Sequence, residues 1–260
     1  MRANWVREKL RAGEPTIGCF LGLGSPNAAE LLAHAGFDWL VIETEHNGLD
    51  SAEVEHMLMA MNGTDAIPIV RVPSSNPVFI QRALDIGGLG VVVPLVRSSA
   101  EVEGIVAATR FPPDGVRSFG PLRASRYTLD YEEYLARANE NMLVTLIVET
   151  REAVENLEEI ASVPGVDVLF LGLFDLCLSF GLNPIDLPHP EADEIIERTL
   201  AVGRDRNVAV GIGLSAPDEV PRRLEQGFTF LVYSTDYFLL LNAARGGLAA
   251  FGGGDAGTHG

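Results

Sequence analysis

The sequence predicts an α/β fold, a single (β/α)8 barrel, from three observations. Eight short segments rich in apolar and β-branched residues recur along the chain, and eight parallel strands close such a barrel. Several of them, such as VVVPLV and VLFLGL, are continuous apolar runs, which is typical of strands covered on both faces. Segments with helical periodicity separate them. The predicted strands are 16–22, 39–45, 67–72, 89–96, 143–149, 166–171, 208–213 and 228–233.

Helix-start signals lie between these strands. Asp50 and Glu53 have the spacing of a capping box before an apolar repeat, and Ser98 and Glu101 have the same spacing. Ser215 stands just before a proline-containing turn that suits a helix start. The chain therefore alternates strand and helix, and a doubly wound open sheet is the alternative to the barrel.

Length and composition indicate one soluble globular domain. The chain has 260 residues, of which 47% are hydrophobic and 21% charged. No change in composition marks a second domain, so we expect one barrel over residues 1–250. The glycine-rich residues 251–260 are predicted to form a flexible tail.

The charge and the N-terminal sequence exclude several classes of partner. A net charge of −17, with no basic patch, repels phosphate backbones and makes nucleic acid an improbable partner. The N-terminus lacks the apolar region of a signal peptide, and no apolar run reaches the roughly 18 residues that span a bilayer. We therefore expect a cytoplasmic protein with no membrane partner.

Two carboxylates occupy the same place in successive repeats. Glu149 ends one predicted strand, and Asp175 follows the next one. The carboxyl ends of parallel strands meet at one rim of a barrel, so we expect these side chains to face each other. Hard divalent cations such as Mg²⁺ prefer oxygen ligands, and two carboxylates would leave positions for a substrate. The alternative is that each acid caps a helix or pairs with a basic neighbour.

His46 and Arg71 are further candidates for chemistry at that rim. His46 follows the second predicted strand, where Glu43 or Glu45 could orient its ring and raise its basicity. Arg71 ends the third predicted strand and needs an anionic partner there, either a protein carboxylate or a substrate. The alternatives are a surface histidine and a structural salt bridge.

Asp85 lies near the end of a predicted helix, where the helix dipole disfavours an acid. That placement suggests a role beyond solvation, although a turn-forming Asp before two glycines is equally consistent. The long connection 111–130 is rich in Pro, Gly, Ser and Arg, as functional or subunit-contact loops are. We expect its arginines, Arg117, Arg123 and Arg126, to meet an acidic or polyhydroxylated acceptor, reaching a neighbouring subunit.

Six motifs, in order and at family-like spacing, resemble one enzyme family: GFDWLVIETEH, IPIVRVP, QRALDIGGLGVVVPLV, ATRFPPDGVRSFG, VETREAVENL and GVDVLFLGLFDLCLSFG. Over about residues 18–244 the chain resembles the metal-dependent (class II) pyruvate aldolases of the 2,4-dihydroxyhept-2-ene-1,7-dioate aldolase and 2-dehydro-3-deoxyglucarate aldolase family, related to citrate lyase. The resemblance implies a TIM barrel of the phosphoenolpyruvate/pyruvate type. It also implies a homohexamer, a trimer of dimers, whose C-terminal helix is exchanged between subunits.

The resemblance also implies roles for particular residues. Glu149 and Asp175 match the ligands of a divalent cation, Mg²⁺, Mn²⁺ or Co²⁺. His46 matches the acid/base histidine, and Arg71 matches the arginine that binds the enolate oxygen and the metal-bound pyruvate. Asp85 matches the acid that supports the histidine.

Two further matches concern the surroundings of the metal. Glu43 stands where the family has a supporting Asp, and the backbone of Gly172, Leu173 and Phe174 corresponds to the segment that receives the substrate carboxylate. Two departures occur: Ile147 replaces a common Gln, and Leu173 with Phe174 adds bulk beside the pyruvate pocket. These departures affect the expected size of the donor substrate and the hydration of the metal, and they leave the expected ligands Glu149 and Asp175 unchanged.

The predicted function is reversible retro-aldol cleavage of a 2-keto-4-hydroxy acid to pyruvate and an aldehyde through a metal-bound pyruvate enolate. The protein would thus be a carbon–carbon lyase whose partners are a small keto acid and an aldehyde. Oxaloacetate decarboxylation through the same enolate is an alternative, and a non-catalytic ligand-binding barrel is a second one. The sequence does not identify the aldehyde.

Overall fold

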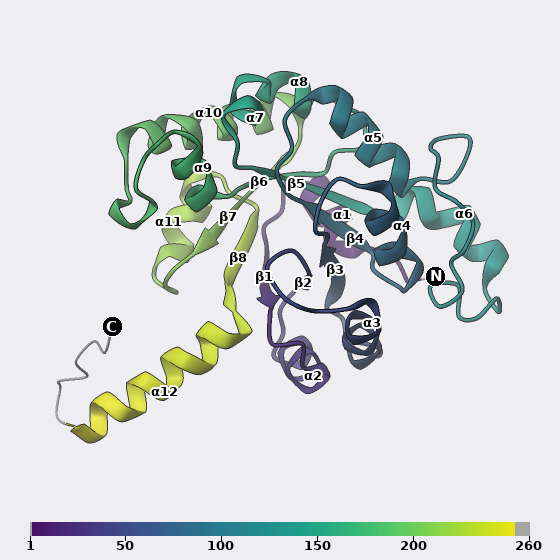
Figure 1. The fold of residues 1–260 in the computed structure, drawn as a ribbon, viewed down its shortest axis with the longest axis horizontal. Coiled ribbons are helices and arrows are strands. Elements are labelled where there is room, and N and C mark those ends of the chain that lie inside the picture. The colour runs from purple at the N-terminus through teal and green to yellow at the C-terminus, as the bar shows by residue number, and fades with distance from the viewer. Residues whose placement is uncertain (1, 253–260) are drawn as a thin grey trace.

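A computed structural model, which describes residues 2–252, shows eight parallel strands closed into a barrel in sequence order, with β1 paired to β8 (Figure 1). Each predicted strand is present, and only its ends shift, by one to three residues. This closed sheet confirms the predicted barrel and excludes the alternative, a doubly wound open sheet. The strands are β1 (Thr16–Leu21), β2 (Trp39–Glu43), β3 (Ile67–Arg71), β4 (Gly90–Val93), β5 (Leu143–Val148), β6 (Val168–Leu171), β7 (Ala209–Leu214) and β8 (Phe230–Thr235).

Helices follow the strands around the outside of the barrel. They are α1 (Trp5–Arg11), α2 (Pro26–His34), α3 (Ser51–Ala60), α4 (Pro77–Asp85), α5 (Ser99–Thr109), α6 (Tyr131–Asn141), α7 (Arg151–Glu155), α8 (Leu157–Ala161), α9 (Leu173–Ser179), α10 (Pro190–Arg206), α11 (Glu219–Gln226) and α12 (Asp236–Gly252), with a short 3-10 turn, η1 (Pro184–Asp186). The capping box of Asp50 and Glu53 is present. The Ser98 hydroxyl accepts the Glu101 amide at 3.3 Å.

The helix predicted to follow Ser215 starts later than expected. The Glu219 carboxylate accepts the amide hydrogens of Ser215 at 2.9 Å and of Ala216 at 3.2 Å. The Glu219 side chain thus provides the hydrogen-bond acceptor for these two amides. Residues 215–218 form a turn, and α11 begins only at Glu219.

Aromatic rings from even-numbered strands fill the barrel interior. Trp39 of β2 stacks on Phe230 of β8, with ring centroids 3.9 Å apart, and Phe170 of β6 packs edge-on to Phe230. Glycines on the intervening strands make room, since a Cβ on Gly18 would lie 2.2 Å from the Trp39 ring and one on Gly211 would lie 2.9 Å from Phe230. Alternate strands thus contribute the large side chains of one layer, as is usual in these barrels.

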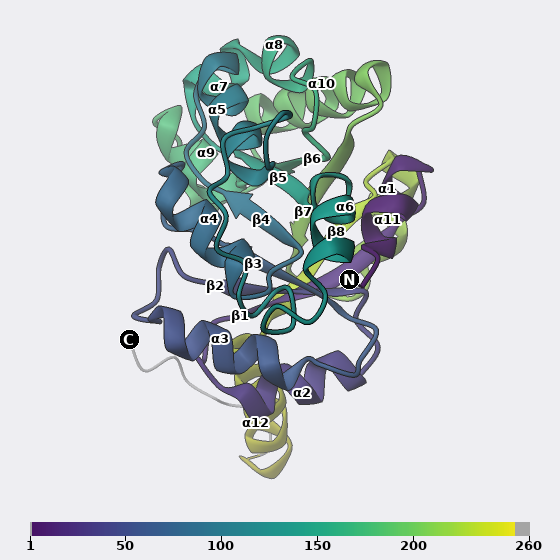
Figure 2. The same ribbon diagram turned by 90° about the vertical axis from the view of Figure 1, so that its right-hand side faces the viewer.

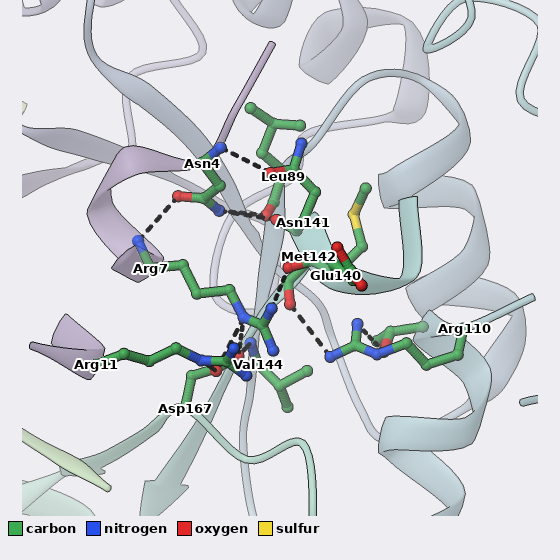
Figure 3. A network of polar contacts seen from close by, with 11 residues as sticks. Asn4, Arg7, Arg11, Leu89, Arg110, Glu140, Asn141, Met142, Val144 and Asp167 are labelled. Atoms are coloured by element: carbon green, nitrogen blue, oxygen red, sulfur yellow. Dashed lines mark hydrogen bonds and ion pairs between the residues drawn. The ribbon is translucent and has the colours of Figure 1, made fainter. Parts of the chain in front are cut away.

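The amino ends of the strands are closed by α1 through a buried polar network (Figure 3). The Arg7 Nε donates to both carboxylate oxygens of Asp167 at 2.9 Å, and both side chains are almost fully buried. Asp167 also accepts the Val144 amide at 3.0 Å, which connects the starts of β5 and β6. The Asn4 amide group donates to the carbonyls of Leu89 and Asn141. This network ties α1 to the amino ends of the strands, on the side opposite to Glu149.

The last helix, α12, projects beyond the barrel outline (Figures 1 and 2). Its exposed apolar side chains are Tyr237, Phe238, Leu240, Leu241, Leu248 and Phe251. The predicted flexible tail covered residues 251–260; Phe251 and Gly252 are the end of α12, and 253–260 lie outside the described residues. Within the described residues there is no helix long and apolar enough to cross a membrane.

Candidate active site at the carboxyl end of the barrel

Glu149 follows β5 at the carboxyl rim and is almost fully buried. Its Oε1 accepts the backbone N–H of Leu95 at 2.7 Å. Leu95 has φ 55°, a left-handed conformation that is unusual for a leucine and that occurs where the surrounding structure imposes it. The neighbouring strand loop is therefore shaped to orient one oxygen of Glu149.

The other oxygen of Glu149 lies against Gly172, the residue before α9. A Cβ on Gly172 would lie 2.8 Å from Glu149 Oε2, so only glycine permits this close approach. Asp175 is in the first turn of α9, so it lies on a helix that begins immediately after β6. The two acids predicted to share a rim come from adjacent strand ends.

The electrostatics of Glu149 reflect this crowding. The pKa of Glu149 is raised from 4.5 to about 7, chiefly by burial and to a smaller extent by the negative charges of Asp175 and Glu45. The Leu95 amide and the charge of Arg71 lower it. A buried carboxylate with neighbouring carboxylates is costly to ionise unless a cation compensates it.

Arg71 ends β3 and is held by two acids from the end of β2. Its Nη1 donates to Glu43 Oε2 at 2.9 Å, and its Nη2 forms an ion pair with Glu45. All three side chains are nearly buried. Of the two anionic partners that the sequence left open for Arg71, the protein carboxylate is present, while the Nε of Arg71 is buried and unpaired within the described residues.

His46 lies just past β2, with 62% of its side chain exposed. Its Nε2 is 3.4 Å from Glu45 Oε2. Glu43 is not the acid beside the ring, because its Oε1 instead accepts the amides of Glu45 at 2.6 Å and His46 at 3.3 Å. Glu43 thus fixes the turn that presents His46, and Glu45 contacts the imidazole.

Asp85 is located away from this rim. It is the last residue of α4, which runs back towards the amino ends of the strands, and its Oδ1 accepts from Arg117 Nη2 at 2.6 Å. No recorded bond within the described residues joins it to His46. Within one chain α4 carries Asp85 to the other end of the barrel from His46, so its support of the histidine stays a prediction.

The arginines of the 111–130 connection are also committed elsewhere. Arg117 is buried against Asp85 and the Tyr134 hydroxyl, and Arg123 donates to the Ile86 carbonyl. Arg126 is exposed and pairs with Asp130. The expected contact of this loop with an acceptor, reaching a neighbouring subunit, stays a prediction.

The donor set at the rim fits a hard divalent cation. Glu149 and Asp175 offer carboxylate oxygens, the type of ligand that Mg²⁺ and Mn²⁺ favour. The charge set by Glu43, Glu45, Glu149 and Asp175 exceeds what Arg71 can compensate. In the part of the chain that the structure describes, no cluster of three or more His, Cys, Asp or Glu forms a metal cage. A two-carboxylate site open to substrate is what the residues support.

Some functional features carry no signal in the sequence. The role of Leu95 depends on a left-handed φ that nothing in the letters indicates. The sequence left open whether Glu43 or Glu45 orients the His46 ring, and the contacts of Glu45 with Arg71 and His46 favour Glu45. Asn47 and Thr235, which line a cavity beside Arg71, were not identified at all.

Comparisons with known proteins agree with this geometry. Residues 16–243 match the family described as HpcH/HpaI aldolase/citrate lyase. The chain is 40% identical to a 4-hydroxy-2-oxo-heptane-1,7-dioate aldolase of Shigella sonnei, covering 96% of this chain and 95% of that one. It is 38% identical to a 2-dehydro-3,6-dideoxy-6-sulfogluconate aldolase of Pseudomonas putida, covering 94% and 95%.

A solved structure gives the same result. The crystal structure of an HpcH/HpaI aldolase/citrate lyase family protein from Burkholderia cenocepacia superposes with a TM-score of 0.91 and 37% sequence identity, covering 95% of this chain and 99% of that one. These matches confirm the predicted family, the (β/α)8 fold and the aldolase class. The chain belongs to the HpcH/HpaI aldolase/citrate lyase family and is a carbon–carbon lyase.

Proposed function

We propose that this aldolase reversibly cleaves a 2-keto-4-hydroxy acid to pyruvate and an aldehyde, with a divalent cation at Glu149 and Asp175. The observation that carries the proposal is the position of both acids, with Arg71 and His46, at one rim. The relatives are named for the cleavage of 2-oxo acids, and the small keto acid and aldehyde follow from that chemistry.

Glu149 and Asp175 are the residues that would hold the cation. When bound there, it would act as a Lewis acid that polarises the keto group of pyruvate. Because the Glu149 carboxylate is buried, water solvates its negative charge poorly. A cation bound beside it would stabilise that charge. Gly172 keeps the approach to Glu149 Oε2 open.

The start of α9 is the proposed seat of the substrate carboxylate. The cap position is Gly172, and no side chain caps the helix amides there. The amides of Leu173 and Phe174 are therefore left to an external acceptor, and the positive end of a helix favours an anion. The side chain of Phe174, beside these amides, is exposed.

Arg71 would stabilise the negative charge that develops on the keto oxygen. Its guanidinium is held by Glu43 and Glu45, so it needs little reorganisation when that charge forms.

His46 is the proposed proton carrier between the aldol hydroxyl and solvent. Its exposure allows exchange with water, and Glu45 at 3.4 Å can stabilise the protonated ring. We further propose that Asp85 reaches His46 of a neighbouring subunit, since the resemblance pairs the two and the fold separates them within one chain. The exposed apolar face of α12 is consistent with the expected hexamer and exchanged helix.

Activity of the purified protein with Mg²⁺ or Mn²⁺ tests the central proposal. Pyruvate and a small aldehyde should give an adduct, and chelation should abolish its formation. Glu149→Gln should abolish it too, whereas Glu152→Gln, an exposed glutamate three residues further on, should not. His46→Ala should lower turnover with the metal still bound. Oxaloacetate turnover in the same preparation measures the decarboxylase alternative; decarboxylation without aldol chemistry would contradict the proposal.

Subunit mixing tests the role of Asp85. His46→Ala and Asp85→Asn subunits should each be inactive alone. Mixed oligomers should regain activity, because some sites combine an intact His46 with an Asp85 from the neighbour. If Asp85 acts only within its own chain, every mixed site keeps one defect and no activity returns.

A further inference from the structure

A cavity of about 240 Å³ adjoins the site beside Arg71 and His46. It lies between the carboxyl ends of β1, β2, β3 and β8 and the start of α12, and neither Glu149 nor Asp175 lines it. At ~30 Å³ per water in the liquid, its volume equals roughly eight waters, enough for a small organic molecule. Its lining residues are Phe20, Gly22, Glu43, His46, Asn47, Arg71, Thr235 and Tyr237.

Three polar groups of this lining are buried without a hydrogen-bond partner among the described residues. They are the side-chain nitrogen Nδ2 of Asn47, the Nε of Arg71 and the hydroxyl of Thr235. An unsatisfied buried polar group costs about 1–3 kcal/mol, so three on one cavity call for a polar occupant. Two are donors only, and the hydroxyl can donate or accept.

The charge of the cavity favours a neutral occupant. Arg71 is already paired with Glu43 and Glu45, so it offers one free N–H but no uncompensated positive charge. Asn47 and Thr235 are neutral, and Glu43 contributes a carboxylate to the lining. A second carboxylate entering here would face the Glu43 carboxylate and an arginine that is already paired, whereas hydroxyl oxygens would find three hydrogen-bonding groups.

The cavity wall is held in place by Asp236, which is buried between Thr235 and Tyr237. Its carboxylate accepts the amides of Gly22 at 2.8 Å and Leu23 at 3.1 Å, which fastens the end of β1 to the start of α12. A Cβ on Gly22 would lie 2.9 Å from the Tyr237 ring and 3.1 Å from Asn47 Nδ2, so this wall has no spare room. The three polar groups are therefore preorganised.

We propose that this cavity binds the part of the acceptor aldehyde beyond its carbonyl, and that the acceptor is a neutral hydroxyaldehyde. The inference rests on the proposed function and specifies its second substrate. In the synthetic direction the pyruvate methyl carbon loses a proton and bonds to the aldehyde carbon. The aldehyde oxygen takes up a proton, so the hydroxy-keto acid is the sum of the two reactants. That oxygen would lie near Arg71 and His46, and the remaining chain would enter the cavity.

The test compares two three-carbon aldehydes, glyceraldehyde and propionaldehyde, with succinic semialdehyde as an acidic acceptor. Wild type should prefer glyceraldehyde over both. Thr235→Val and Asn47→Ala should each lower kcat/KM for glyceraldehyde about 5- to 10-fold, the loss of one neutral hydrogen bond, and should leave propionaldehyde within about 2-fold. Thr145→Val is the matched control, because the Thr145 hydroxyl is also buried and unpaired but does not line the cavity. It should not change the preference.

Exchange of the pyruvate methyl protons in D₂O, followed by NMR with Mg²⁺ or Mn²⁺, separates the two levels of failure. If exchange occurs but the variants do not change the aldehyde preference, or wild type prefers succinic semialdehyde, the cavity assignment is wrong and the aldolase proposal stands. If wild type neither exchanges protons nor forms adducts, the proposed function fails and the acceptor assignment falls with it.

Discussion

The raised pKa of Glu149 makes a quantitative prediction about the metal-free protein. Burial raises this pKa from 4.5 to about 7 in the folded state, while the unfolded chain has the ordinary value. Between about pH 4.5 and 7 the unfolded chain has released the proton of Glu149 while the folded protein still holds it. The free energy of unfolding therefore falls as pH rises through this window. A difference of about 2.5 pKa units at 1.36 kcal/mol each gives at most about 3 kcal/mol.

Glu149→Gln isolates this contribution, because its side-chain carbonyl can still accept the Leu95 amide but cannot ionise. At pH 4.5 wild type and variant should have similar free energies of unfolding. By pH 8 the variant should be more stable than metal-free wild type by up to about 3 kcal/mol. Urea unfolding in chelator, at half-unit steps from pH 4.5 to 8, measures the difference.

Divalent cation should reverse the order at high pH. Bound metal stabilises the folded state by mass action, and protonation of Glu149 competes with it, so the stabilisation of wild type should grow as pH rises to about 7. Glu149→Gln should show little of it, and Glu152→Gln should behave as wild type. Parallel pH profiles for wild type and Glu149→Gln in chelator would refute the reasoning.

Three other substitutions test separate parts of the structure. Gly172→Ala places a Cβ 2.8 Å from Glu149 Oε2 and should weaken Mn²⁺ binding at least about 10-fold in calorimetry with the circular dichroism spectrum kept; unchanged affinity would argue against Glu149 as a ligand. Arg7→Met leaves Asp167 buried without its main counter-charge and should lower the free energy of unfolding by about 3–5 kcal/mol in urea, without changing pyruvate exchange per folded molecule. Gly22→Ala pushes against Tyr237 and Asn47 and should raise the KM for glyceraldehyde more than that for pyruvate, a split that a general folding defect would not produce.

The rim could be predicted from the sequence because parallel strands impose it. Glu149, Asp175, His46 and Arg71 each stand at the end of a predicted apolar strand or a few residues past it, and in a closed parallel barrel all such points lie on one side. The same reasoning placed all eight strands. Local patterns suffice for features that depend on neighbours in sequence.

Features that depend on long-range packing could not be predicted in the same way. Asp85 has a plausible position in its own helix, but only the direction of α4 and the contact with Arg117 show that it faces away from the rim. The buried pair of Arg7 and Asp167 joins residues 160 positions apart. The cavity beside Arg71 likewise combines Asn47 with Thr235, whose letters carry no motif.

The charges at the rim explain why these parts belong together. Glu43, Glu45, Glu149 and Asp175 bring four carboxylates to adjoining strand ends, and within the described residues Arg71 is the permanent cation recorded among them. Burial also raises the pKa of Glu45, despite the opposing charge of Arg71. A divalent cation at Glu149 and Asp175 would lower the excess negative charge to a level at which one more anion, the carboxylate of a keto acid, can enter. A second acidic substrate would restore the excess, so the neutral donors beside Arg71 and the proposed metal site follow from the same electrostatic constraint.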